Sequence, residues 1–208
     1  VLVKGLKRLE YRGYDSAGVA IMNTDDLRLH KCKGKVVDLE NLVGSADTTG
    51  SLGIGHTRWA THGVPNDVNA HPHASGDGNI VLIHNGIIEN YAALKEALIA
   101  KGHLFQSDTD TEVLVHFIQD VMEETGMGLF ESVRSALTEV IGAYAIVLFD
   151  RRNPNQLVCA KKSSPLVIGV GAEGEYYIAS DATPFIEYTK NAVYLEDEEV
   201  ALIERGKD

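Results

Sequence analysis

The stretch YAIVLFDRRNPNQLVCAKK, residues 144–162, decides the fold class. It holds two apolar runs, YAIVLFD and QLVCAKK, separated by the turn residues Asn153-Pro154-Asn155. Runs of this length, rich in β-branched and aromatic residues and bounded by turn signals, are typical of the two strands of a hairpin. Further apolar runs follow with short turns between them: PLVIGVG, EYYIAS, AVYL and EVALIE. Because short turns join antiparallel neighbours, this half of the chain is predicted to pair antiparallel.

The amino-terminal half adds more strands and a separate group of helices. Strands are predicted for AGVAIMN (17–23), LRLHKC (27–32), LGIGH (52–56) and NIVLIH (79–84). Helices are predicted near residues 1–9, 36–43, 90–101, 111–124 and 129–140. Helices grouped apart from strands predict an α+β architecture in which sheet packs on sheet and the helices lie outside.

Composition limits the classes of partner and the compartment. The 208 residues are enough for one packed domain, with no linker or repeat. A net charge of −11 argues against nucleic acid or an anionic membrane as the main partner, because both demand a basic surface. Cys32 and Cys159 are far apart, which suits a reducing compartment, and no apolar run reaches membrane-spanning length. A cytoplasmic protein is therefore expected.

The polar run HTRWATHG, residues 56–63, directly follows the apolar strand LGIG. Glycines on both sides let the backbone bend. One interpretation is that these side chains line a pocket, where Arg58 could hold a carboxylate. The alternative is a strand-to-loop junction whose hydroxyls and imidazoles hydrogen-bond only their own backbone.

The segment HNGIIEN, residues 84–90, raises a similar choice. Asn85-Gly86 is predicted to end an apolar strand, and it is not followed by the second strand that a hairpin needs. An ordinary turn would explain the pair. A functional interpretation is that the asparagine amide and the glycine N–H supply two donors to a developing oxyanion.

The segment SDTDTE, residues 107–112, is predicted to start a helix with a capping box formed by Thr109 and Glu112. Asp110 is either part of that start or a carboxylate near a pocket. A carboxylate there and Arg58 on the opposite wall would fit the ammonium and carboxylate of a free α-amino acid.

No metal site and no cofactor are expected. Five histidines lie close together in sequence, but their spacing matches no ligand motif; they are His56, His62, His71, His73 and His84. Cys32 lies in an alternating strand and is interpreted as a small buried hydrophobe rather than a nucleophile. The run GVGAEGE opens a strand rather than a helix, which argues against a dinucleotide site.

Seven segments, in order, resemble the glutaminase (glutamine amidotransferase type 2) domain of the glucosamine-6-phosphate synthase family, the isomerising glutamine:fructose-6-phosphate aminotransferases. They are RLEYRGYDSAG (8–18), GHTRWATHG (55–63), NAHPH (69–73), HNGIIEN (84–90), SDTDTE (107–112), RSALTEVIGAYA (134–145) and SPLVIG (164–169). Amidophosphoribosyltransferases and asparagine synthetases share the fold and the general scheme. EYRGYDSAG and HTRWATHG resemble the sugar enzymes more closely.

The resemblance implies an amino-terminal nucleophile (Ntn) hydrolase fold, a four-layer αββα sandwich of antiparallel sheets that removes ammonia from L-glutamine. It implies that Arg58 holds the α-carboxylate of glutamine, supported by Thr61 and His62. Asp110 is implied to bind the α-ammonium.

The same resemblance implies how the reaction is assisted. Asn85 and Gly86 would form the oxyanion hole. Trp59 would shield the site and gate ammonia, and Arg12 would position the nucleophile region.

The resemblance also implies parts outside residues 1–208. The family's nucleophile is a terminal cysteine whose α-amine acts as the base, and this chain begins at Val1, past that point. The chain on its own is therefore expected to be an inactive glutaminase domain that lacks its first strand. Sugar isomerase domains of a homodimeric parent would bind fructose 6-phosphate for UDP-GlcNAc biosynthesis.

Two alternatives remain at this point. One is the glutaminase domain of another ammonia-channelling transferase, such as amidophosphoribosyltransferase. The other is a glutamine-binding module that has no nucleophile.

Overall fold

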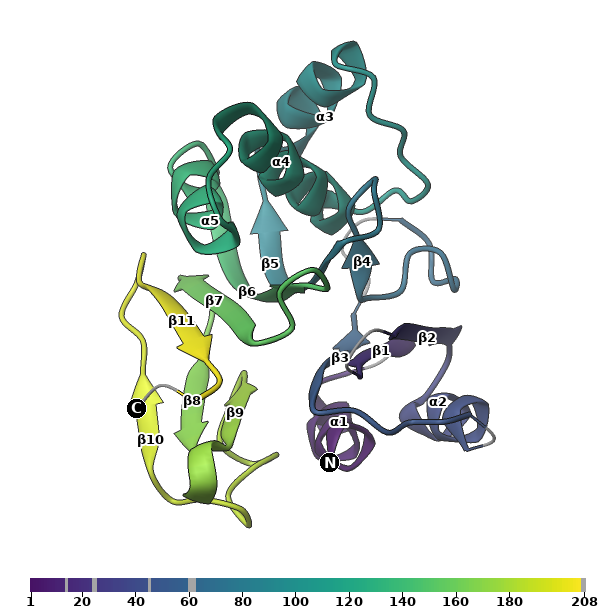
Figure 1. The fold of residues 1–208 in the computed structure, drawn as a ribbon. Coiled ribbons are helices and arrows are strands. Elements are labelled where there is room, and N and C mark those ends of the chain that lie inside the picture. The colour runs from purple at the N-terminus through teal and green to yellow at the C-terminus, as the bar shows by residue number, and fades with distance from the viewer. Residues whose placement is uncertain (14, 24–25, 45, 60–62, 207–208) are drawn as a thin grey trace.

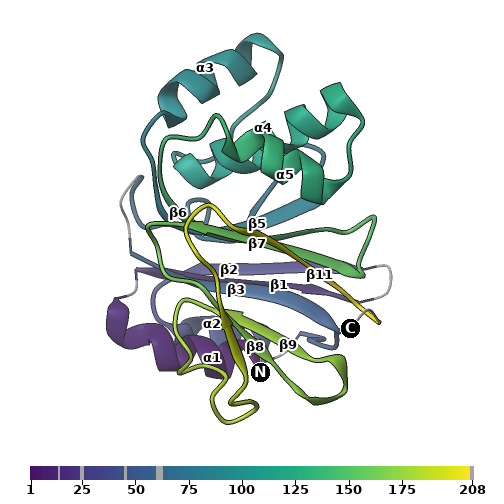
Figure 2. The same ribbon diagram turned by 90° about the vertical axis from the view of Figure 1, so that its left-hand side faces the viewer.

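The computed structural model describes residues 1–13, 15–23, 26–44, 46–59 and 63–206. Its elements stack in four layers, two sheet layers inside and a helical layer on each outer side (Figure 1, Figure 2). Figure 2 views the layers edge-on, with α3, α4 and α5 on one outer side and α1 and α2 on the other. The predicted α+β class and αββα sandwich are confirmed.

A five-stranded antiparallel sheet forms one inner layer, in the order β11-β7-β6-β5-β4. Its strands are β4 (His73–Ala74), β5 (Ile80–Ile88), β6 (Gly142–Asp150), β7 (Gln156–Lys162) and β11 (Val200–Glu204). The helices on its outer face are α3 (Tyr91–Ala100), α4 (Asp110–Thr125) and α5 (Leu129–Leu137). Ile146 and Leu148 of β6 pack with Leu114 of α4, whereas Val147 and Phe149 belong to the core between the sheets. Because β6 is buried on both faces, its sequence is a continuous apolar run.

A second sheet, in the order β2-β1-β3, lies across the inter-sheet core. Its strands are β1 (Ser16–Met22), β2 (Leu27–Lys33) and β3 (Leu52–Arg58), and the helices outside it are α1 (Leu2–Leu9) and α2 (Val36–Val43). Met22 of β1 and Ile54 of β3 join the inter-sheet core, while Val19 packs with Leu6 of α1 and Leu39 of α2. The three buried clusters therefore fill the three interfaces between the four layers.

The carboxyl-terminal strands divide between the two sheet layers. A three-stranded sheet, β10-β8-β9, is formed by β8 (Val167–Val170), β9 (Tyr176–Ala179) and β10 (Ala192–Tyr194). Strand β11 instead pairs with β7 in the five-stranded sheet. Two short 3-10 helices, η1 (Glu10–Arg12) and η2 (Ala172–Gly174), complete the assigned elements.

Two strand edges face a common cavity. Strand β3 pairs with β1 and strand β9 with β8, each along one side only within the part of the chain that the structure describes. Residues of both strands line the same cavity. Each edge therefore presents backbone donors and acceptors that another strand could use.

The predicted helix starts and the hairpins agree with the structure. The β1–β2 and β6–β7 pairs are antiparallel. Thr109 caps α4, since its Oγ1 accepts a hydrogen bond from the Glu112 N–H at 3.2 Å. A complete capping box would also need the Glu112 carboxylate to accept from the Thr109 N–H. That carboxylate accepts from the Ser107 N–H at 2.7 Å instead, so only one of the two predicted hydrogen bonds forms.

The predicted end of a strand at Asn85-Gly86 is wrong. Strand β5 continues to Ile88, with Asn85 opposite Ala145 and Gly86 opposite Tyr144. The glycine looks like a strand breaker in the sequence, but here its φ of 132° is accommodated inside the ladder. Elsewhere, none of the helices in the described ranges is long and apolar enough to cross a membrane.

Candidate active site

A cavity of about 1430 Å³ gathers the predicted site residues that the structure describes. Arg58 and Trp59 come from the end of β3, Asn85 and Gly86 from β5, and Asp110 from the start of α4. These elements belong to three of the four layers. The packing of the layers therefore brings together residues that are far apart in sequence.

Arg58 is a nearly buried cation at the end of β3, with 4% of its surface exposed. Its Nη2 donates to the Gly63 carbonyl at 3.1 Å, and its Nη1 lies 3.7 Å from Asp15 Oδ1. Burial lowers the pKa of Arg58, while the charges of Asp15 and Asp110 raise it. A guanidinium starts from so high a pKa that it stays charged at neutral pH. The cavity wall thus carries a fixed positive charge, suited to a carboxylate.

Trp59 lies next to Arg58 and is 71% exposed. Its ring lies over Gly13, where a Cβ atom would be 1.8 Å from Trp59 Cε3. Gly13 also has a φ of 112°, so the glycine of EYRGYD is required both by the backbone and by the ring. The exposed ring is also part of the cavity lining.

Asn85 and Gly86 form the wall supplied by β5. A Cβ atom at Gly86 would be 2.0 Å from the carbonyl oxygen of Ala143, so no side chain fits. Asn85 is exposed to the cavity, and its Oδ1 lies 2.8 Å from Nε2 of His56 on β3. The amide and the adjacent backbone are therefore accessible to a bound molecule.

Asp110 is the first residue of α4 and is 4% exposed. Its Oδ2 accepts a hydrogen bond from the Ile88 N–H at 2.8 Å, which ties the helix to β5. A carboxylate in the first turn is also stabilised by the positive end of the helix dipole. Since its charge raises the pKa of Arg58, the two opposite charges interact across the site.

Three predicted residues cannot be compared with the structure. Thr61, His62 and the side chain of Arg12 lie outside the described residues. Their implied roles stay predictions.

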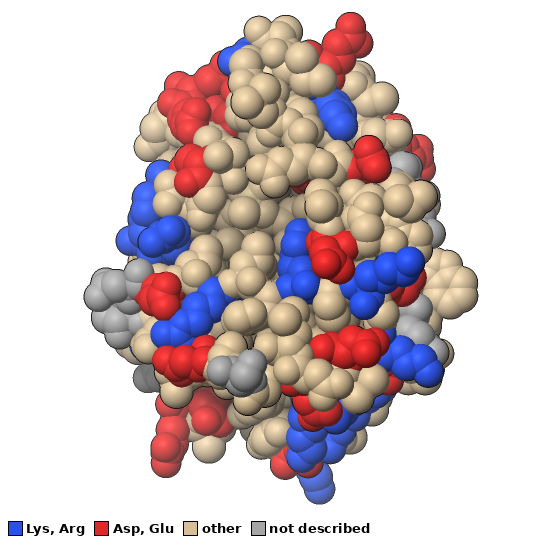
Figure 3. Space-filling model, turned by 90° about the vertical axis from the view of Figure 1, so that its right-hand side faces the viewer, with Lys and Arg blue, Asp and Glu red and all other residues tan. Residues whose placement is uncertain are grey.

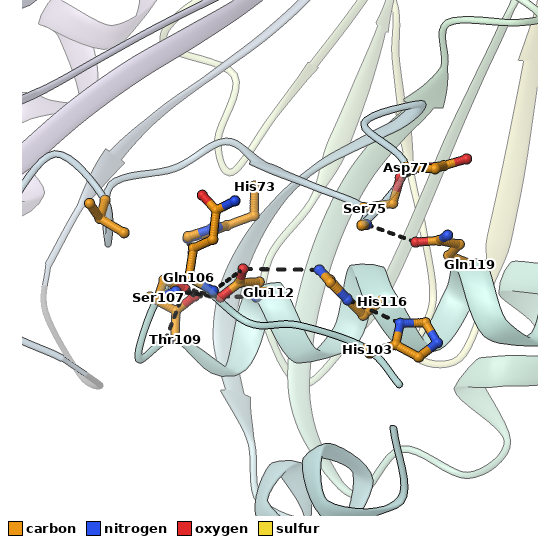
Figure 4. A network of polar contacts seen from close by, with 12 residues as sticks. His73, Ser75, Asp77, His103, Gln106, Ser107, Thr109, Glu112, His116 and Gln119 are labelled. Carbon is orange, nitrogen blue, oxygen red and sulfur yellow. Dashed lines mark hydrogen bonds and ion pairs between the residues drawn. The ribbon is translucent and has the colours of Figure 1, made fainter. Parts of the chain in front are cut away.

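A polar network fixes the segment before Asp110 (Figure 4). Glu112, 5% exposed, accepts from the Ser107 hydroxyl at 2.6 Å and from the Gln106 N–H at 2.9 Å. Thr109 Oγ1 lies 3.1 Å from His73 Nε2. In Figure 4 the His116 ring, which is 2% exposed, lies between Glu112 and His103. These contacts border a second, polar cavity of about 840 Å³, and they hold the start of α4 in place.

Four of the five clustered histidines meet in the interior; they are His56, His71, His73 and His84. The rings of His56 and His71 stack with centroids 4.2 Å apart, and those of His71 and His73 meet edge-on at 5.0 Å. Burial lowers the pKa of His56 to about 4 and those of His71 and His73 well below their usual value. Within the described ranges no group of three or more His, Cys, Asp or Glu side chains could hold a metal ion. The imidazoles of His56, His71 and His73 are therefore neutral hydrogen-bonding groups at neutral pH.

Neither cysteine is an activated thiol. Burial is the main cause that raises the pKa of Cys32, and the charges of Asp38 and Asp67 raise it further. Burial raises the pKa of Cys159 to about 12. Cys32 packs against the core between β1 and the outer helices, but it is half-buried rather than buried as predicted.

The sequence interpretation gave no role to two residues that contact this site. Asp15 approaches Arg58 because it directly precedes Ser16, which is paired with Arg58 in the β1–β3 register. His56 reaches Asn85 across the two sheets. Only the strand pairing and the packing of the sheets reveal these contacts.

The face shown in Figure 3 carries interspersed basic and acidic side chains and is hollowed near its centre. No broad patch of one sign covers that face. The net charge of −11 is therefore not concentrated there.

Known proteins resemble the chain over nearly its whole length. A family model described as "Glutamine amidotransferase domain" matches residues 44–205. The chain is 58% identical over 209 residues to the glutamine–fructose-6-phosphate aminotransferase (isomerizing) of Bacteroides thetaiotaomicron, covering 100% of this chain and 34% of that protein. It is 52% identical to the Thermus thermophilus enzyme of the same name, covering 99% of this chain and 33% of that protein. The chain thus spans about a third of the length of these curated relatives.

Among solved structures, the fold is similar to the glutamine phosphoribosylpyrophosphate amidotransferase of B. subtilis, with a TM-score of 0.81 and 28% identity. That match covers 98% of this chain and 44% of the other. A predicted glutamine amidotransferase from Pseudomonas aeruginosa, at 18% identity and a TM-score of 0.59, shares the fold. The Ntn amidotransferase fold expected from the sequence is confirmed. The chain belongs to the glutamine amidotransferase domain family.

Proposed function

We propose that this chain is the glutamine-hydrolysing domain of an isomerising glutamine:fructose-6-phosphate aminotransferase. The observation that carries the proposal is the convergence of Arg58, Asp110 and the Asn85-Gly86 pair on one cavity. A buried cation and a buried carboxylate are the two charges that a zwitterionic amino acid requires. The names of the relatives, which are 44–58% identical, support the choice of enzyme.

In this proposal L-glutamine binds with its α-carboxylate on Arg58 and its α-ammonium on Asp110. Thr61 and His62 support the carboxylate side. Trp59 covers the bound substrate and gates the released ammonia. These contacts leave the side-chain amide of glutamine directed towards β5.

The reaction needs a nucleophile, which we propose is a cysteine at the mature amino terminus, in a strand that precedes Val1. Its α-amine, with a pKa of about 8, takes the thiol proton. The sulfur then adds to the amide carbon, and the developing oxyanion accepts hydrogen bonds from the Asn85 amide and the Gly86 N–H. Ammonia leaves with a proton returned by the amine, and water hydrolyses the thioester to glutamate. Arg12 is proposed to position the nucleophile region.

The open edges of β3 and β9 support a preceding strand. Each edge lacks a strand partner within the described ranges, and both line the cavity that holds the site. A strand laid there would join the β2-β1-β3 and β10-β8-β9 sheets and bring its first residue near Asn85. Residues 1–208 are then a glutaminase domain that has no activity without that strand.

The remaining steps are proposed for the complete protein. Sugar isomerase domains bind fructose 6-phosphate and use the ammonia to form glucosamine 6-phosphate, in a cytoplasmic homodimer that serves UDP-GlcNAc biosynthesis. The relatives are about three times as long as this chain, which leaves room for such domains. An amidophosphoribosyltransferase is not favoured, because identity to that structure is 28% against 58% for the sugar enzyme.

The experiment is glutamate release by the complete protein with a terminal cysteine, an acetylated terminal cysteine, or a terminal serine. Activity is expected only with the free-amine cysteine. The isolated 208-residue chain is expected to release no glutamate. Equal rates with free and acetylated cysteine would contradict the assignment of the α-amine as base. Glutamate release by the 208-residue chain alone would contradict the proposal that the nucleophile lies in a preceding strand. It would favour a catalytic group within residues 1–208.

A further inference from the structure

His56 contacts the proposed oxyanion-hole residue directly. It lies on β3 two residues before Arg58, and 8% of its surface is exposed. Its Nε2 is 2.8 Å from Asn85 Oδ1 on β5. This contact joins the two sheets at the point where Asn85 meets the cavity.

His56 can supply only one N–H at neutral pH. Burial lowers the pKa of its imidazole to about 4, so the ring is neutral and carries one proton. Its Nδ1 is buried and makes no hydrogen bond of acceptable geometry among the described residues, although the His84 backbone lies near enough to the ring to raise its pKa. A proton on Nδ1 would therefore be a buried donor without a well-placed acceptor, which is rarer than an unpaired acceptor. The Nε2–H tautomer avoids this and donates to Asn85.

The protonated nitrogen of His56 sets the orientation of the Asn85 amide. If Nε2 donates, Asn85 must turn its Oδ1 to His56, and its NH₂ group is directed away from the ring. If Nε2 were the acceptor, the NH₂ group would point at His56 and the amide oxygen would face the other way. An oxygen aimed at a developing oxyanion would repel it, whereas an N–H would stabilise it.

The surrounding imidazoles hold His56 in place. Its ring stacks on His71 at an interplanar angle of 18°. His71 Nε2 lies 3.3 Å from Thr111 Oγ1, and His71 Nδ1 accepts from the His84 N–H at 3.4 Å. Because His71 accepts at Nδ1, its own proton is on Nε2, so the stacked pair consists of two neutral rings in the same tautomer.

We propose that His56 is a positioning residue, whose Nε2–H holds the Asn85 amide with its NH₂ group towards the reacting carbonyl. This inference rests on the proposed function, in which Asn85 is an oxyanion-hole donor. It predicts that His56 affects turnover only through Asn85.

Two substitutions separate a donor from a space-filling ring. The side-chain NH₂ of His56→Gln reaches about as far as Nε2, whereas that of His56→Asn reaches only about as far as Nδ1. In the complete protein, His56→Asn is expected to lower kcat by about 10 to 100-fold, part of the loss typical of one oxyanion-hole donor, with KM little changed. His56→Gln is expected to retain most of kcat. Equal losses of kcat in the two variants would overturn the proposal.

A double-mutant cycle with Asn85→Ala gives the second readout. Once Asn85 is gone, His56→Asn is expected to lower kcat by less than about threefold. The same 10 to 100-fold loss in both backgrounds would show that His56 does not act through Asn85. His30→Asn changes an imidazole on β2 that lines neither cavity; it is the control for general damage and is expected to leave kcat unchanged.

The tautomer can be measured without any turnover. Imidazole ¹⁵N shifts in the intact protein, assigned by their loss in His56→Gln, are expected to show a neutral ring protonated at Nε2. A ring protonated at Nδ1 would overturn the inference even if Asn85 proves catalytic. If instead Asn85→Ala keeps full kcat, the oxyanion hole fails while the tautomer result stands, so the two failures are distinguishable.

Discussion

Gly86→Ala tests the geometry of the β5 wall directly. The added Cβ would lie 2.0 Å from the oxygen and 2.7 Å from the carbon of the Ala143 carbonyl, and both atoms are backbone in the paired strand. The φ of 132° is also unfavourable for alanine. Backbone strain of this kind costs about 1–3 kcal/mol and overpacking a further 1–3 kcal/mol. The lower entropy of the unfolded alanine chain offsets roughly 0.4–1 kcal/mol of this.

The expected loss of unfolding free energy is therefore roughly 1–6 kcal/mol. Urea unfolding followed by circular dichroism measures it, provided that the m-value is unchanged. Gly78→Ala is the matched control, because Gly78 also has a positive φ, 73°, but nothing lies within 4 Å of its added Cβ. That variant is expected to lose at most about 1 kcal/mol. If the two variants have equal free energies of unfolding, the Ala143 carbonyl does not lie as close to Gly86 as the structure places it.

Four further predictions concern the site and the buried groups. Arg58→Lys should weaken glutamine binding by on the order of 2–3 kcal/mol, since the bidentate fork is lost; a change in KM under about twofold would mean no substrate contact. Asn85→Ala should lower kcat by about 10² to 10³ with KM nearly unchanged, and a destabilised variant with full turnover would contradict the oxyanion hole. The thiol of Cys159, with its pKa raised to about 12 by burial, should resist alkylation in the folded state, as peptide mapping by mass spectrometry would show. The free energy of unfolding should fall as the pH is lowered from about 6.5 to 4. Each buried histidine whose pKa is lowered by folding contributes a fall of about 1.4 kcal/mol per pH unit. The unfolded state takes up a proton near pH 6.5, whereas folded His56 does so only near 4; a flat profile from pH 6.5 to 5 would rule out buried neutral imidazoles.

The layers could be predicted from the sequence because burial determines which residues a strand can carry. The run YAIVLFD is apolar at every position up to Asp150, and in the structure one set of its side chains faces the helices and the other the second sheet. Thr109 could likewise be predicted as a cap, since a hydroxyl before a helical repeat meets an otherwise unpaired N–H. Both signals are local.

The site could be predicted only in part, because its contacts are not local. In the sequence the pair Asn85-Gly86 looks like a turn. In the structure β5 stays paired with β6 through these two residues and as far as Ile88. The reach of Asp110 to the Ile88 N–H and of His56 to Asn85 depends on how α4 and the two sheets pack. Neither spacing nor residue type encodes these distances, so the sequence indicated the residues but not their partners.

The contacts that cross layers also explain why the site depends on three of the four layers at once. Arg58 and His56 come from β3 in one sheet, while Asn85 and Gly86 come from β5 in the other. The His56–Asn85 hydrogen bond spans the two sheets, and the Asp110–Ile88 hydrogen bond attaches the helical layer to the same strand. The Arg58 cation, the Asp110 carboxylate and the two donors of Asn85-Gly86 can be held at fixed separations only if the two sheets and the helical layer keep fixed positions relative to one another. Since packed interiors resist small displacements, the inter-sheet core positions these groups before any substrate binds.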